Sequence, residues 1–161
     1  MDPAMMAQAM AQMKNMRADD WARAKEQMGR MSPEEIQRQA SAAQAQMSAQ
    51  AKYMLSASKT LKTEGNALHA RGEYRAAAEK YERARSNVAD HASGEGADLK
   101  RSCLLNLSSC YLNLGEFARC IESCDAVLSG DASNLKALYR RGQAHLGAKR
   151  YRAAASDLEA A

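Results

Sequence analysis

A short motif recurs three times along this 161-residue chain. Its copies are Gly72-Glu73-Tyr74, Gly115-Glu116-Phe117 and Lys149-Arg150-Tyr151, and the second and third copies are 34 residues apart. Self-similarity at a period of about 20–50 residues is typical of repeat proteins, in which each unit buries its apolar face against the next unit. The period therefore predicts a repeat protein, and the high content of Ala, Leu and Met with only two prolines indicates that its repeats are helical.

The positions around the motif repeat as well. The first copy holds Leu61, Gly65, Leu68, Tyr74, Ala77, Tyr81 and Ala84; the second holds Leu104, Ser108, Tyr111, Phe117, Cys120, Cys124 and Val127; the third holds Leu138, Gly142, His145, Tyr151, Ala154, Leu158 and Ala161. Small residues in these sets let the two helices of a hairpin approach closely. On this pattern the chain resembles the tetratricopeptide-repeat (TPR) family, and the resemblance implies an all-α solenoid of about 2.5–3 repeats.

The predicted organisation has two parts. A helical, partly disordered segment rich in Met, Ala and Gln covers residues 1–50, and a TPR domain covers residues 51–161. The repeats are expected at about 58–91, 101–134 and 135–161, with the last one truncated. Because the helix that usually covers a last repeat is missing, we expect the chain to be a fragment of a longer protein.

The first two copies of the motif are separated by a longer interval. Gly72 and Gly115 lie 43 residues apart, and the extra residues fall in Asp90–Asp98, which is rich in Gly, Ala and acidic residues. We expect a loop between repeats with some helical extension.

The N-terminal segment carries most of the ten methionines and a duplication that relates residues 12–23 to 27–38. Ser32, Pro33 and Glu35 form the pattern of an N-cap, a first helical position and a capping box, so a helix should begin near Ser32 and run toward Gln50. The segment is either an adaptable Met-lined surface for an apolar partner or a weakly ordered helical extension. Its low apolar content favours the extension.

Five polar residues occupy related positions on the first helices of the three repeats. They are Lys62 and Asn66, then Asn106, then Lys136 and Arg140. Residues four apart share one helix face, so all five side chains can point into one groove. Cations and amides in one groove suit a ligand that carries two carboxylates.

This set resembles the dicarboxylate-clamp TPR domains of Hsp70 and Hsp90 co-chaperones. The resemblance implies that Lys62, Asn66 and Asn106 hold the terminal carboxylate of a tail ending in Glu-Glu-Val-Asp, while Lys136 and Arg140 meet the Asp side chain and nearby backbone. Secondary contacts are expected from Ser109, Leu112 and Asn113, the last standing where several clamp domains carry lysine.

The chain is also similar to plant TPR receptors of the chloroplast outer envelope and endoplasmic reticulum that dock Hsp70-bound precursors. That resemblance implies a docking receptor on the cytosolic face of a membrane, whose anchor would lie in the missing C-terminal part. Two alternatives remain: a TPR scaffold independent of chaperones, and the regulatory TPR module of a larger enzyme.

Other classes of function find little support in the sequence. The three histidines have no nucleophile, base or phosphate-binding loop around them, so we expect neither an enzyme nor a cofactor. Cys120 and Cys124 fill repeat positions and no C-x₂-C pair occurs, which argues against a metal site. The net charge is +4, but Lys and Arg residues alternate with Asp and Glu along the chain. We therefore expect no nucleic-acid partner. No apolar run reaches the ~20 residues of a membrane span.

Overall fold

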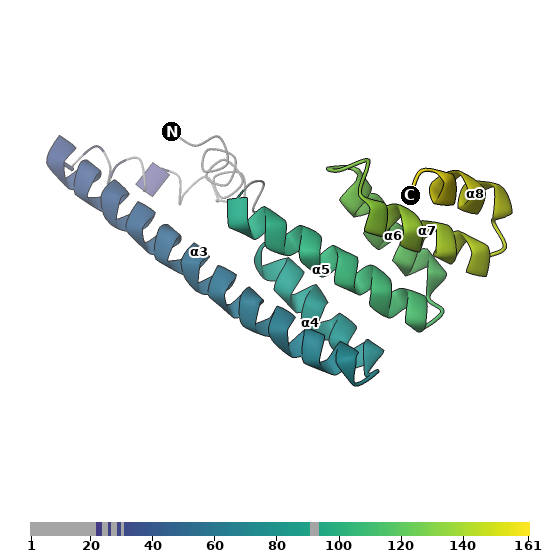
Figure 1. Cartoon of the computed structure of the whole chain (residues 1–161). Helices are drawn as coiled ribbons and strands as arrows, with labels where there is room; N and C mark the ends of the chain where they lie inside the picture. Colours follow the sequence, from purple (N-terminus) through teal and green to yellow (C-terminus); the bar gives the residue numbers. More distant parts are fainter. Residues whose placement is uncertain (1–21, 24–25, 27–28, 30, 91–93) are drawn as a thin grey trace. The chain divides into compact units, whose positions relative to one another are not determined.

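The computed structural model describes residues 22–23, 26, 29, 31–90 and 94–161 (Figure 1). Its helices are α3 (Pro33–Ala70), α4 (Tyr74–Asn87), α5 (Gly94–Asn113), α6 (Phe117–Leu128), α7 (Leu135–Gly147) and α8 (Tyr151–Glu159). The described residues contain no strand. The chain divides into two compact units, Met1–Ala49 and Gln50–Ala161.

The second unit is a stack of three helical hairpins. The end of α3 pairs with α4, α5 pairs with α6, and α7 pairs with α8; each hairpin contacts the next, and α5 also packs against α7. The first helices of the repeats are therefore the end of α3, α5 and α7, as the 34-residue period predicts.

The recurring motif marks the turn inside each hairpin. Gly72, Gly115 and Lys149 all adopt positive φ angles, of 78°, 71° and 59°. The next residue donates its backbone N–H to the carbonyl five residues earlier, in the pairs Glu73 to Leu68, Glu116 to Tyr111, and Arg150 to His145. This hydrogen bond defines the Schellman motif, which satisfies carbonyls at a helix C-terminus. Three different sequences therefore end their helices in the same way.

Close packing inside each hairpin depends on small residues, as the repeat pattern predicts. A Cβ atom at Gly65 would lie 2.7 Å from the Tyr81 ring, and one at Gly142 would lie 2.8 Å from the Leu158 side chain. The second repeat has Ser108 at this position, fully buried, with its hydroxyl donating to the Leu105 carbonyl at 2.7 Å. A serine therefore fits between the two helices, because a carbonyl of its own helix accepts the hydrogen bond from its hydroxyl.

The four cysteines belong to the core. Cys103, Cys110, Cys120 and Cys124 are all buried free thiols. Burial raises the pKa of Cys103 and of Cys110 to about 11. Cys120 and Cys124 occupy the packing positions that the repeat register assigned to them.

Helix α3 begins where the sequence predicted. The backbone N–H of Ser32 donates to the Glu35 carboxylate at 2.8 Å, and the Glu35 N–H donates to the Ser32 hydroxyl at 3.2 Å. Hydrogen bonds from Ser32 also lower the pKa of Glu35. The helix does not end near Gln50, however, but continues to Ala70 because residues 34–64 contain no Gly or Pro that would interrupt it. The expected boundary near residue 50 thus lies within one helix.

The stretch Asp90–Asp98 contains the helical extension that the sequence predicted. Helix α5 starts at Gly94, so the second half of this stretch is helical, and its next turn is anchored by the buried Leu99. Residues 91–93 lie outside the described ranges, as does most of the N-terminal duplication.

Candidate functional site

A cavity of about 270 Å³ opens between the first helices of the three repeats. We call it the groove cavity; it is lined by Asn66, His69, Ala70, Tyr81, Asn106, Ser109 and Arg140. These residues come from α3, α4, α5 and α7. Four of the eight residues expected to contact a ligand, namely Asn66, Asn106, Ser109 and Arg140, therefore meet at one place.

The two asparagines are joined by hydrogen bonds. The side-chain carbonyl of Asn66 accepts from the Tyr81 hydroxyl at 2.7 Å and from the amide of Asn106 at 3.1 Å. Burial raises the pKa of Tyr81 to about 12, which keeps its hydroxyl protonated at neutral pH. With its carbonyl satisfied in this way, the NH₂ group of Asn66 remains as a donor for a ligand.

Arg140 brings a positive charge to the groove cavity. Its Nη1 donates to the Leu105 carbonyl at 2.6 Å and lies 3.5 Å from the Ser108 hydroxyl. Both partners are neutral, and within the described ranges no carboxylate pairs with this guanidinium. Because arginine carries five N–H donors in a rigid plane, the contact with α5 holds the group in place and leaves donors for an anion.

The two predicted lysines lie one turn before the groove residues. On α3, Lys62 precedes Asn66 and donates to the Ser102 hydroxyl at 3.4 Å. On α7, the exposed Lys136 precedes Arg140. Neither lysine lines the groove cavity in this conformation. Both are on the same helices as cavity residues, at the four-residue spacing that places side chains on one face.

Leu112 and Asn113 do not line the groove cavity. Leu112 is half-buried and packs against the core. Asn113 is exposed at the end of α5, where its amide donates to the carbonyl of Ser109 at 2.8 Å. Of the three secondary contacts expected from the sequence, only Ser109 therefore lines this cavity.

Three lining residues were not among the predicted contacts: His69, Ala70 and Tyr81. The Nε2 atom of His69 lies 3.0 Å from the Ser109 hydroxyl, and its ring packs edge-on against Tyr74 with centroids 5.1 Å apart. The spacing of His69, three residues after Asn66 on the same helix, is the signal that could have identified it. Tyr81 was assigned only to helix packing, although its hydroxyl reaches the groove.

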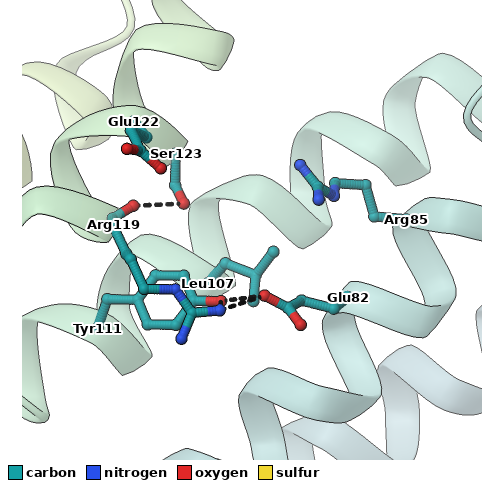
Figure 2. Close-up of a pocket in the computed structure, with 7 residues that line it drawn as sticks. All are labelled: Glu82, Arg85, Leu107, Tyr111, Arg119, Glu122 and Ser123. Carbon is teal, nitrogen blue, oxygen red and sulfur yellow. Dashed lines mark hydrogen bonds and ion pairs between the residues drawn. The ribbon is translucent and has the colours of Figure 1, made fainter. Parts of the chain in front are cut away.

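A second cavity, of about 180 Å³, lies among α4, α5 and α6 (Figure 2). Tyr111 donates its hydroxyl to the carboxylate of Glu82, and Arg119 donates to the same carboxylate at 2.6 Å. The Arg119 guanidinium also lies 4.2 Å from the centroid of the Tyr111 ring. Burial, together with the bond to Glu82, raises the pKa of Tyr111.

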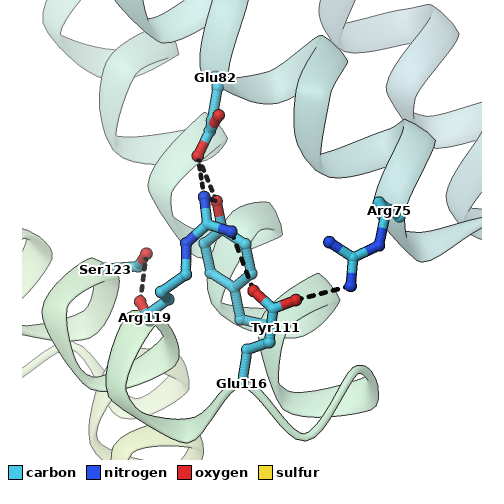
Figure 3. A network of polar contacts seen from close by, with 6 residues as sticks. All are labelled: Arg75, Glu82, Tyr111, Glu116, Arg119 and Ser123. Atoms are coloured by element: carbon cyan, nitrogen blue, oxygen red, sulfur yellow. Dashed lines mark hydrogen bonds and ion pairs between the residues drawn. The ribbon is translucent and has the colours of Figure 1, made fainter.

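This cluster continues to the turn of the second hairpin (Figure 3). Arg119 pairs with Glu116 at 2.9 Å, and Glu116 pairs with Arg75 at 2.9 Å. Hydrogen bonds from Arg119 hold the pKa of Glu116 below its usual value. The cluster joins the first repeat to the second through these ion pairs. Because its positive and negative charges neutralise one another, the groove cavity is the better site for an anion.

The described residues contain no group of three or more His, Cys, Asp or Glu side chains that could hold a metal ion. Their helices include no apolar stretch of the length that a membrane span requires.

The curated relatives that match this chain are larger proteins. Outer envelope protein 61 of Arabidopsis thaliana is 44% identical over 120 residues, which cover 74% of this chain and 22% of that protein. The peptidyl-prolyl cis-trans isomerase FKBP4 of Mus musculus is 32% identical over 111 residues, which cover 65% of this chain and 24% of that protein. The chain thus spans about a quarter of the length of these relatives. No model of a known protein family matches it.

Solved structures share the fold. A multi-domain immunophilin from Arabidopsis thaliana superposes with a TM-score of 0.63 at 27% identity, over 68% of this chain and 46% of that one. The first TPR of Spaghetti (RPAP3), bound to the HSP90 peptide SRMEEVD, superposes with a TM-score of 0.56 at 24% identity, over 66% and 77% of the two chains. The chain therefore has the tetratricopeptide-repeat fold and belongs to the tetratricopeptide-repeat proteins.

Proposed function

We propose that the groove cavity binds the carboxylate-bearing C-terminus of a chaperone, the tail of cytosolic Hsp70 or Hsp90 that ends in Glu-Glu-Val-Asp. The observation that carries the proposal is the meeting of Asn66, Asn106 and Arg140, from three repeats, in one cavity. Among the lining residues Arg140 supplies a positive charge, and no carboxylate is present. An anion is the ligand that such a wall favours.

The contacts can be assigned to the two carboxylates of a terminal aspartate. The free NH₂ group of Asn66 and the second N–H of Asn106 donate neutral hydrogen bonds to the chain-terminal carboxylate. Arg140 meets the Asp side chain. Lys62 and Lys136 complete the set by moving their flexible side chains into the groove from one turn away, which a change of rotamer allows.

Two of the similar proteins support a chaperone tail as the ligand. The RPAP3 domain, which shares the fold, is bound to an HSP90 peptide with the sequence SRMEEVD. Outer envelope protein 61 is the relative with 44% identity. By extension, we propose that residues 51–161 act as the TPR part of a docking receptor that brings chaperone-bound precursors to a membrane from its cytosolic side.

A binding experiment with charge-matched variants tests the proposal. Arg140→Ala should weaken binding of a peptide ending in Glu-Glu-Val-Asp at least tenfold, because hydrogen bonds to charged groups contribute about 1.5–3 kcal/mol. Arg152→Ala removes the same charge from an exposed position on α8 and should leave binding unchanged. Circular dichroism checks that both variants remain helical. Equal affinities for the two variants would refute the assignment of Arg140.

The match to FKBP4 favours a second arrangement, in which the repeats are a binding module of a larger enzyme. In that case the chain itself performs no catalysis, and the tail-binding groove serves to attach the enzyme to its partner. Binding of the same peptide is expected in both arrangements. The sequence of the full-length protein separates them, because an isomerase domain would be visible there.

A further inference from the structure

His69 lies in the wall of the groove cavity, beside the residues proposed to hold the ligand. Its Nε2 atom is 3.0 Å from the Ser109 hydroxyl of α5. The ring is half-buried, with its edge against Tyr74 of α4. The imidazole is therefore held in one position by two neighbouring helices and stays in contact with the space that a ligand would fill.

The charged surroundings of His69 are simple. Asn66, Asn106 and Ser109 are neutral, the Tyr81 hydroxyl stays protonated at neutral pH, and Arg140 on α7 is the charged lining residue. In the following turn, Arg71 and Glu73 pair with each other at 2.6 Å. Among the described residues no carboxylate is paired with His69.

This arrangement changes when an anion binds. Without a ligand, the imidazole shares the cavity with one cation, Arg140, and no carboxylate lines it. A bound carboxylate reverses the local field and favours the protonated ring. Histidine is the side chain that ordinarily changes charge between about pH 5 and pH 8.

We propose that His69, placed in the wall of the groove cavity beside Arg140, makes the binding of an anionic peptide terminus pH-dependent, with a proton taken up when the peptide binds. The inference rests on the function proposed above. Affinity should rise as the pH falls from about 8 to about 5.5, because peptide carboxylates lose their charge only near pH 4. His69 would thereby make the strength of tail binding respond to the pH of the surrounding solution.

Calorimetric titration of the full chain tests this inference. The probe is an N-acetylated peptide ending in Glu-Glu-Val-Asp, since acetylation removes an α-amino group that also titrates near pH 8. Titrations at pH 8, 7 and 6, each in two buffers of different ionisation enthalpy, give the affinity and the number of protons taken up. We expect about three- to tenfold tighter binding at pH 6 than at pH 8, together with a net uptake of protons on binding.

Two variants separate charge from packing. His69→Gln keeps a polar side chain within reach of Ser109 but cannot become cationic, so both the pH dependence and the proton uptake should disappear. Ser109→Ala removes the hydrogen bond and keeps the histidine, so the affinity can change at every pH while its pH dependence and the proton uptake should persist. His69→Asn serves as a second neutral variant in case the glutamine variant does not fold.

The outcomes are distinct. Binding of equal strength at pH 8 and pH 6, or a His69→Gln variant that still takes up a proton, would overturn the role of His69 while leaving the tail-binding function intact. Failure of the wild-type chain to bind the peptide at every pH would overturn the proposed function itself, and this inference with it.

Discussion

The hydroxyl of Tyr81 donates a hydrogen bond of 2.7 Å to the side-chain carbonyl of Asn66, so a core residue fixes the orientation of a groove residue. The ring of the same tyrosine, on α4, occupies the space left by the missing side chain of Gly65 on α3. Helix packing in the first hairpin and the geometry of the proposed ligand site therefore depend on one side chain.

Replacing Tyr81 by Phe should weaken peptide binding about three- to tenfold. The ring can still pack against Gly65, but the amide of Asn66 loses the stronger of its two partners and can rotate, which costs about 1 kcal/mol in a typical hydrogen bond. Calorimetric titration gives the affinity. Tyr139→Phe, at a 52% exposed tyrosine on α7, is the control and should bind like the wild type. Unchanged affinity in Tyr81→Phe would show that this bond does not organise the groove.

Gly65→Ala should lower the free energy of unfolding by about 1–3 kcal/mol, the usual cost of adding a methylene to a close-packed core. The new Cβ atom would lie 2.7 Å from the ring of Tyr81, and this buried ring has little room to move away. Urea unfolding measures the change. Gly130→Ala is the matched control, because its Cβ would meet nothing closer than 3.8 Å. A Gly65→Ala protein as stable as the control would contradict the close packing of α3 on α4.

Lys149→Gly should stabilise the third hairpin by about 0.5–1 kcal/mol. Lys149 adopts a φ of 59°, where the other two repeats have glycine. A residue with a Cβ atom pays about 1–2 kcal/mol for this conformation, part of which is offset by the greater flexibility of glycine in the unfolded chain. Thermal unfolding should show a higher midpoint for Lys149→Gly and little gain for Lys149→Ala. A gain shared equally by both variants would point to the lysine side chain instead of the backbone.

Glu82→Ala should destabilise the contact between the first two repeats by about 1–3 kcal/mol, because the Tyr111 hydroxyl, on a residue only 3% exposed, loses the acceptor of its proton. The same change made in a Tyr111→Phe background should cost less, since no buried hydroxyl is then left without a partner. A double-mutant cycle by urea unfolding measures the difference. Equal costs in both backgrounds would show that the Tyr111 bond contributes nothing.

Much of the fold could be predicted from the sequence because the repeat constrains it at several levels at once. The positions of Gly65 and Gly142 predicted where helices pack closely. The alignment placed Lys149 in register with Gly72 and Gly115 although its residue type differs, and the structure gives all three positive φ angles. The capping box at Ser32 located the start of α3 through a local hydrogen-bond pattern. Resemblance to the TPR family was confirmed by the comparisons.

Two features were harder to predict from the sequence. The continuation of α3 past Gln50 is indicated only by the lack of Gly and Pro in residues 34–64, which is a weaker signal than a helix cap. The place of His69 in the groove depends on Ser109 and Arg140, which are brought near it by two other repeats. The ligand contacts of all eight predicted site residues stay a prediction; the side chains of Lys62 and Lys136 lie outside the groove cavity here.

We have proposed that the groove cavity recognises a chain-terminal carboxylate. This recognition can be measured by calorimetric titration with a peptide ending in Glu-Glu-Val-Asp, beside the same peptide with an amidated C-terminus. We expect micromolar binding, about −8 kcal/mol, to the free acid and none to the amide. Equal binding of both peptides, or binding of neither by a chain shown to be folded, would contradict it.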